Sequence, residues 1–438
     1  MEQEKQSFTE KAVNKIRQSP TIKLFIIGIL ILVLLIPSGM IEGLIREREE
    51  NHNSAINEIS DKWGKAQVIT GPVIAVPYTE TIKNESGQFV AVQRYSYYLP
   101  DDLSITGDVQ SQKRHRGIYE AVLYAGKLHF EGNFDSACLN TLPALPATAR
   151  LNEAKILLGI SDVRGIRNKV ALNWNNTNIN AQPAADEELF PSAISFPLTG
   201  IDLQNGGNFG FDLDFAGSQS LYFTPVGKNN KIKLTSNWGG PSFDGAFLPT
   251  SHTENVNGFT AEWSVLELNR SFVQHWLGQN SNLHNSDFGV RMWMSADEYQ
   301  KSHRSVHYCV LFISLTFIFF FIIELRSKIS VHPVQYLLIG LAISIFYLLL
   351  LSLSEWTGFN PAYFISAAAV TTLISLFSIS VLESKFYSLI TAIIQVLLYA
   401  FLFTTLQLED LSLLIGSIGL FLTLAIFMYF SRRLNKQE

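Results

Sequence analysis

The chain has 438 residues, of which 47% are hydrophobic and 16% are charged, and its formal net charge is -5. Such a weakly acidic chain has no strongly basic surface, so its composition argues against a nucleic-acid-binding protein. The averages combine two unlike parts, because residues 42–303 are polar and mixed whereas the last third of the chain is almost devoid of charge.

The first predicted element is a membrane anchor over Ile22–Met40, which is apolar apart from Lys23 near its start. A helix crosses the hydrocarbon core with about 20 apolar residues, so this length suffices. The basic residues before it also suit a secretory signal peptide. Because the stretch Pro37–Glu42 lacks an A-x-A-like cleavage site, we favour an uncleaved anchor.

The middle of the chain is predicted to be a β-rich domain carried on short helical stalks. Residues 42–62 continue the anchor as a polar helix, and Asp297–Arg304 is expected to begin the second membrane helix. Between them, short alternating segments are separated by turn signals, which is typical of an all-β sandwich or barrel-like domain. The expected strands are Val68–Thr70, Val73–Val76, Gln93–Tyr98, Ala121–Phe130, Phe209–Phe215 and Lys231–Leu234.

Other segments of this domain are expected to be less regular. Gly71-Pro72 is predicted to be a turn between the first two strands, and Arg270–Gly278 a short helix. Leu142–Pro146 and Ala181–Pro191 are expected to be long loops. Cys138 is the only cysteine of the domain, and Cys309 lies in a membrane segment, so we expect no disulfide between them.

Five further apolar segments follow, and five in succession indicate membrane helices rather than buried core helices. They are Val306–Ile323, Val334–Leu353, Ala362–Leu382, Phe386–Leu408 and Leu411–Phe430. Gln335 and Gln395 are their notable polar residues, and we expect both to form hydrogen bonds between helices. The absence of charges inside these segments argues against an ion-coupled transporter but leaves a lipid-handling role open.

Lysine and arginine in the short loops predict the orientation. Arg326, Lys328 and Lys385 lie in turns on the side of the N-terminus, whereas the turn Ser354–Pro361 and the stretch around Glu409-Asp410 contain neither residue type. The positive-inside rule then places both termini in the cytoplasm and the large domain on the extracytoplasmic side, the periplasm of a diderm cell. The predicted order is a cytoplasmic tail over 1–21, an anchor over 22–41, a β-rich extracytoplasmic domain over 42–303, a five-helix membrane block over 304–431 and a cytoplasmic tail over 432–438.

The sequence contains no H-E-x-x-H, G-x-S-x-G, P-loop or dinucleotide-binding fingerprint, and no Cys/His cluster with zinc spacing. We therefore predict no catalytic residue, cofactor or metal.

Three features nevertheless have a functional alternative. His303 and His307 have the i, i+4 spacing of metal ligands, but histidines at a membrane boundary are the simpler interpretation. Asp162 beside Arg164 could be a catalytic carboxylate, although a turn held by aspartate-to-backbone bonds is favoured. Arg114-His115-Arg116 could bind phosphate or a lipid head group, or form a solvated loop.

Six groups of sequence blocks follow one another along the chain. They comprise Glu58-Ile59, Trp63-Gly64, Gln67 and Gly71-Pro72; Leu99–Leu103, Arg114, Arg116–Tyr119 and Ala121-Val122; Ser161-Asp162 and Arg164–Ile166; Trp238, Pro241–Phe243, Gly245 and Phe247–Pro249; Leu268–Arg270; and His332–Gly340, Phe346–Leu350 and Ser354-Glu355. In this order, the blocks resemble the CreD family of bacterial inner-membrane proteins, from about residue 40 to residue 430.

This resemblance implies an inner-membrane protein with effects on cell envelope integrity, envelope stress and the response to β-lactams, and it implies no reaction. We therefore predict a non-enzymatic envelope-integrity protein with six transmembrane helices and a large β-rich extracytoplasmic domain. Its expected partners are membrane lipids and other envelope proteins, and not nucleic acid. The alternatives are a lipid or lipoprotein transport protein and, third, an enzyme that acts on cell wall or lipid.

Overall fold

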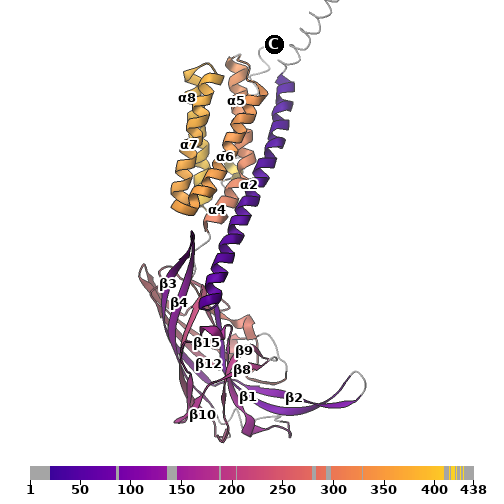
Figure 1. Ribbon diagram of the computed structural model, residues 1–438, viewed down its shortest axis with the longest axis vertical. Coiled ribbons are helices and arrows are strands. Elements are labelled where there is room, and N and C mark those ends of the chain that lie inside the picture. Colours follow the sequence, from indigo (N-terminus) through magenta and orange to yellow (C-terminus); the bar gives the residue numbers. More distant parts are fainter. Residues whose placement is uncertain are drawn as a thin grey trace, which may run out of the picture. The chain divides into compact units, whose positions relative to one another are not determined.

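The computed structural model describes residues 20–84, 88–135, 146–186, 189–203, 205–278, 283–292, 297–327 and 329–408, with a few positions between 414 and 428. The chain forms two compact units: Met1–His52 with Ser295–Glu438, and Asn53–Met294. We call them the helical unit and the β unit, and Figure 1 shows the elements of each.

The predicted anchor and stalk form one continuous helix, α2 (Pro20–Trp63), of 44 residues. Four further helices in the described part of the chain are long and apolar enough to cross a membrane, which makes five such helices with α2. They are α5 (Cys309–Ser327), α6 (Pro333–Thr357), α7 (Phe359–Val381) and α8 (Lys385–Gln407). The sixth predicted segment, Leu411–Phe430, lies largely outside the described residues.

The stalk before the second membrane helix is a separate short helix, α4 (Asp297–His307), and Tyr308 interrupts the helical pattern before α5 begins. The side chains of α2 and of α4 to α8 share one buried cluster. Gly340 of α6 lets α2 approach closely, because a Cβ atom there would lie 2.2 Å from Leu34 Cδ1.

The two membrane glutamines have different roles. Gln395 Nε2 donates to Thr316 Oγ1 at 3.0 Å, which confirms a hydrogen bond between helices. Gln335 was expected to do the same, and this prediction is wrong. Its Oε1 accepts from the backbone N–H of His332 at 2.8 Å, because an open N–H at the start of α6 needs a partner.

The β unit is built from two mixed sheets, which confirms the β-rich prediction. The larger sheet has the order β13-β17-β11-β1-β5-β9-β8, with β2 paired to β1 and β16 to β2. Its strands are β1 (Gln67–Lys83), β2 (Phe89–Tyr98), β5 (Lys155–Ile160), β8 (Gln182–Asp186), β9 (Phe190–Pro197), β11 (Ser220–Thr224), β13 (Ser242–Gly245), β16 (His275–Leu277) and β17 (Phe288–Arg291).

The second sheet has eight strands in the order β14-β15-β12-β3-β4-β10-β6-β7. They are β3 (Asp102–Arg116), β4 (Tyr119–Phe134), β6 (Ala171–Trp174), β7 (Thr177–Asn180), β10 (Gly207–Ser218), β12 (Asn229–Ser236), β14 (Ser251–Asn255) and β15 (Gly258–Leu266). Four short 3-10 turns lie between strands: η1 (Leu151–Glu153), η2 (Val163–Gly165), η3 (Glu267–Asn269) and η4 (Leu283–Ser286).

One apolar core joins the two sheets. The rings of Phe196 on β9 and Phe211 on β10 have centroids 5.6 Å apart, and those of Trp263 on β15 and Phe288 on β17 are 5.8 Å apart. Alternate side chains of strands such as β12 are buried, as the sequence pattern predicts for a sandwich.

Gly71-Pro72 is not a turn between two strands but an interruption inside the single strand β1. The register with β5 shifts between Thr70 and Val73, and β1 pairs with β11 before this point and with β2 after it. Proline lacks a backbone N–H, so it is tolerated at such an irregularity of the ladder. The strand predictions for β2, β4, β10 and β12 are confirmed.

Two further predictions for this domain are wrong. Ala181–Pro191 is not a loop, because it contains β8 and the start of β9, which pair as an antiparallel hairpin at the sheet edge. Arg270–Gly278 is not a helix, because His275–Leu277 pairs with β2. The described part of Leu142–Pro146 is Pro146 alone, and Cys138 also lies outside the described residues. Cys309 is a buried free thiol.

Candidate functional site: the end of helix α2 on the β unit

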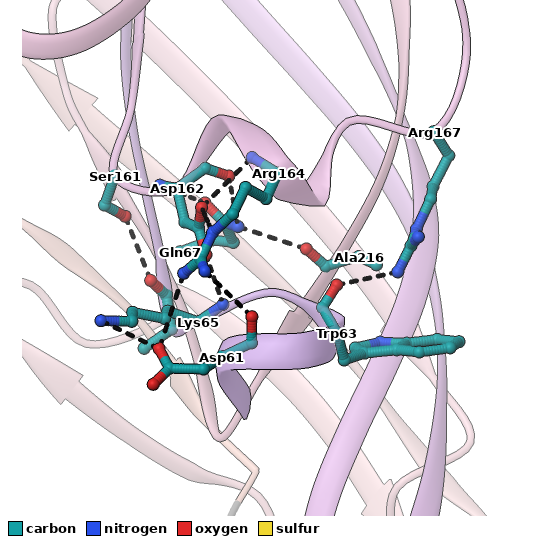
Figure 2. A network of polar contacts seen from close by, with 10 residues as sticks. Asp61, Trp63, Lys65, Gln67, Ser161, Asp162, Arg164, Arg167 and Ala216 are labelled. Carbon is teal, nitrogen blue, oxygen red and sulfur yellow. Dashed lines mark hydrogen bonds and ion pairs between the residues drawn. The ribbon is translucent and has the colours of Figure 1, made fainter. Parts of the chain in front are cut away.

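Helix α2 ends among the strands of the β unit, where two arginines bind its last carbonyl groups. Arg164 Nη1 donates to the Asp61 carbonyl at 3.0 Å, and Arg167 Nη2 donates to the Trp63 carbonyl at 2.8 Å. The final carbonyls of a helix have no partner inside the helix and carry its partial negative charge. The two guanidinium groups therefore cap α2 both by hydrogen bonding and by charge (Figure 2).

Trp63 fixes the same helix end from its side chain. The indole Nε1 donates to the Tyr124 carbonyl of β4 at 3.0 Å, and the Arg167 guanidinium lies 4.6 Å from the ring centroid. Gly64 follows with φ at 146°, and a Cβ atom there would lie 2.7 Å from the Ala216 carbonyl oxygen. Only glycine fits both that conformation and that space, which is why the helix stops at this position.

Asp162 lies at the centre of the site, and four donors surround its carboxylate. Oδ1 accepts from the Arg164 backbone N–H at 3.2 Å and from Arg164 Nε at 2.9 Å. Oδ2 accepts from the Lys65 backbone N–H and from Arg164 Nη2, both at 3.0 Å (Figure 2). Burial raises the pKa of Asp162, but the hydrogen bonds from Arg164 and from the two backbone amides outweigh it and hold the pKa below its usual range.

Gln67 and Gly165 join this carboxylate turn to strand β10. Gln67 Nε2 donates to the carbonyls of Asp162, at 3.0 Å, and Ala216, at 3.2 Å, and its side chain is almost fully buried. Gly165 lies so close to β10 that a Cβ atom would be 2.3 Å from the Ala216 carbonyl oxygen and 2.7 Å from Gln67 Nε2. The turn η2 is therefore pressed onto the sheet with no room for a side chain.

The sequence allowed Asp162 to be either a catalytic carboxylate or the residue that holds a turn, and the structure contains the hydrogen bonds of such a turn. Asp162 is the N-cap of η2 and accepts the Arg164 N–H, as expected for a turn held by an aspartate. Ser161 contributes too, since its Oγ accepts from Val68 N at 2.6 Å. The Asp162 carboxylate accepts four hydrogen bonds from protein donors, which suits holding the last turn of α2 in place within the β unit.

The other two candidate clusters lie elsewhere. His303 Nε2 is 3.4 Å from Glu49 Oε2, and no group of three or more potential metal ligands occurs in the described part of the chain. The predicted solvated loop at Arg114-His115-Arg116 is instead the exposed end of strand β3, held extended by its pairing with β4. Arg116 forms an ion pair with Glu58 of α2.

Sequence reasoning missed Arg167 altogether and used Trp63 and Gln67 only as part of a family pattern. One signal was available, because a long polar helix must end in capped carbonyls. The two arginines that cap α2 lie 103 and 104 positions after the carbonyl groups that they bind, and spacing alone does not identify them. The blocks around Trp63 and Asp162 that carry the family resemblance meet at this one site.

The apolar helices and the β-rich unit define a multi-pass membrane protein with a large folded β domain. The chain matches the model of the family described as "Inner membrane protein CreD" over residues 19–437. It is also 31% identical over 411 residues to the Inner membrane protein CreD of Escherichia coli (strain K12), covering 92% of this chain and 91% of that protein. The chain therefore belongs to the CreD family and is an inner-membrane protein.

Proposed function

We propose that this protein is a non-enzymatic factor that supports cell envelope integrity, including the response to envelope stress and β-lactams. The observation that carries the proposal is the Asp162 carboxylate, whose four hydrogen bonds all come from neighbouring protein groups. A general acid or base needs a position from which it can reach a substrate. The same bonds suit a structural role, in which the last turn of α2 is fixed to the strands within the β unit. Its partners are then membrane lipids and other envelope proteins.

We further propose that both termini face the cytoplasm and that the β unit faces the periplasm. Lysine and arginine in the turns between the membrane helices support this orientation. Reporter fusions at Asn205 and Gly358 are expected to give periplasmic signals, and fusions at Lys328 and Lys385 cytoplasmic signals. A cytoplasmic signal at Asn205 contradicts the whole arrangement.

Asp162→Asn is expected to weaken the protein without removing its function. The amide keeps the shape but loses the charge and part of the hydrogen bonding, which costs about 1–3 kcal/mol. The measurement is complementation of a deletion strain under envelope stress, together with the abundance of the protein in the membrane. We expect reduced abundance, and full complementation once abundance is restored.

Asp212→Asn is a matched control, because Asp212 is an exposed carboxylate that pairs with Lys127 and His129, each at 2.7 Å. Exposed ion pairs contribute little, so neither abundance nor complementation should change. Normal abundance of Asp162→Asn without complementation would count against the non-enzymatic proposal and favour an enzyme that uses this carboxylate.

A further inference from the structure

The far half of the β1–β2 hairpin extends from the β unit as a two-stranded ribbon (Figure 1). β1 and β2 pair as far as Lys83↔Phe89, whereas among the described residues β5 pairs with β1 only as far as Ala75 and β16 with β2 only as far as Ser96. The ribbon carries exposed apolar side chains, since Phe89 is 76% exposed and Val90 is 41% exposed. A ribbon of two strands has little core of its own, so these side chains are not explained by packing within the β unit.

The hydrogen bonds of β2 show which of its backbone groups point away from β1. The Gly278 N–H donates to the Tyr95 carbonyl at 2.9 Å, so Tyr95 faces the side of β16. In an antiparallel strand the residues that face one neighbour alternate with those that face the other. The backbone groups of Phe89, Ala91 and Gln93 therefore face the same side as Tyr95. We call the backbone of Phe89–Gln93 on this side the outer edge of β2.

The outer edge of β2 lacks the features that usually protect the edge of a sheet. Exposed edges commonly carry charged residues or proline, which hinder pairing with another chain. Three other edge strands follow this rule, since β8 contains Pro183, β13 contains Asp244 and β14 contains Glu254. Phe89–Gln93 reads F-V-A-V-Q and contains no charge, proline or glycine. Such a composition favours pairing with another strand.

We propose that the outer edge of β2 pairs with the same edge of a second copy of this chain, antiparallel and about a two-fold axis at Ala91. The residues whose backbone groups face outward are placed symmetrically about that position. With Ala91 opposite Ala91, Phe89 of each strand lies opposite Gln93 of the other. All three residues of both strands can then exchange backbone hydrogen bonds. A two-fold contact of this kind uses the same surface on both copies and closes as a dimer.

The side chains of the segment fit this register. Val90 of each copy lies opposite Val92 of the other, so apolar side chains that are exposed or half-buried in one chain cover each other. Arg94 lies 3.5 Å from Glu80 of its own hairpin, and in this register it comes opposite Gln88. Like charges directly opposite each other would destabilise the pair, and this register opposes none.

The proposed contact is short, and its size determines where it can be measured. Stable interfaces in solution bury about 1,200–2,000 Å², which a single pair of short strands does not reach. Two copies held in one membrane meet at a much higher effective concentration. Self-association is therefore expected for the full-length chain in native membranes, and this is where it should be tested.

Ala91→Cys in a Cys138→Ser background tests the position of the contact. Two cysteines at the axis would have Cα atoms about 5.5 Å apart, which suits a disulfide, and Cys309 is buried and does not interfere. Thr81→Cys is the matched control, because Thr81 is exposed and lies directly opposite Ala91 on β1. Its two copies would be further apart by two strand spacings of about 4.8 Å each.

Mild oxidation of membranes should yield several-fold more disulfide-linked dimer from Ala91→Cys than from Thr81→Cys. Equal yields would mean random collision and would overturn the proposal. A disulfide between Ala91→Cys and a different protein would also overturn it, since the occupant of the edge would then be another envelope protein.

Charge substitutions at the axis test whether the partner is a second copy. Ala91→Lys or Ala91→Glu opposes like charges in a pair of identical chains, whereas a mixture of the two variants opposes unlike charges. Two differently tagged chains are co-expressed, fixed in the membrane with formaldehyde and co-purified. The Lys/Glu mixture should co-purify about two- to five-fold more than either matched pair, at equal abundance in the membrane. Equal co-purification of mixed and matched pairs would rule out a second copy at this edge.

Discussion

Gly165→Ala is expected to cause a large loss of stability in the β unit. The new methyl group would lie 2.3 Å from the Ala216 carbonyl oxygen and 2.7 Å from Gln67 Nε2, and a backbone oxygen inside a sheet cannot move aside cheaply. Overpacking of this kind costs about 3 kcal/mol. That is a large share of the roughly 5–15 kcal/mol by which folded domains are stable, so abundance in the membrane should fall several-fold.

Gly210→Ala is the matched control for this substitution. Gly210 lies on β10, the same strand as Ala216, but a Cβ atom there would meet only the Phe130 carbonyl oxygen, at the ordinary distance of 3.7 Å. The abundance and protease resistance of the Gly210→Ala variant should remain close to those of the parent chain. Equal behaviour of the two variants would mean that η2 does not press on β10 as described.

Glu324→Ala is expected to have a comparable effect on the helical unit. The Glu324 carboxylate is buried and forms an ion pair with Lys23 of α2. It also accepts the Val331 backbone N–H at 2.9 Å and the Tyr336 hydroxyl at 3.0 Å. Alanine would leave all three donors without this partner, and breaking a buried ion pair in this way costs about 3–5 kcal/mol.

The midpoint of thermal unfolding measures this loss. Cys309 is fully buried, so in a Cys138→Ser background a thiol-reactive dye labels the protein only as the helical unit opens. Glu47→Ala is the control, because Glu47 is exposed on α2 and such surface substitutions change stability by about 0.5 kcal/mol or less. If Glu324→Ala leaves the midpoint as Glu47→Ala does, the buried carboxylate does not hold α2, α5 and α6 together.

Membrane helices and central strands could be predicted because each leaves a local pattern in the sequence. An apolar run long enough to cross a membrane, such as Val334–Leu353, has few alternatives, and alternation in Lys231–Leu234 reports one buried face. The strands β8 and β16 were missed for the opposite reason. β8 is a five-residue edge strand that contains Pro183, and β16 has only three residues, so neither shows the alternating pattern that marks a central strand.

In the candidate site, too, local contacts could be predicted from the sequence, whereas contacts between distant residues could not. The turn around Asp162 could be predicted, since aspartate-to-backbone bonds are local. The contact of Arg167 with Trp63 joins positions 104 residues apart, and neither residue type nor spacing specifies it. Such a contact follows from the sheet topology, which brings η2 against the end of α2.

The parallel strand pairs of the β unit govern when it can fold during synthesis. β1 lies beside β11, and β3 lies beside β12, so each early strand requires a neighbour that is made well over a hundred residues later. Until β11 and β12 have been synthesised, both early strands have an open edge able to pair with another chain. Contacts between such distant residues also form slowly. A nascent chain that has reached only residue 200 can complete neither sheet, so this domain closes after most of it has left the ribosome.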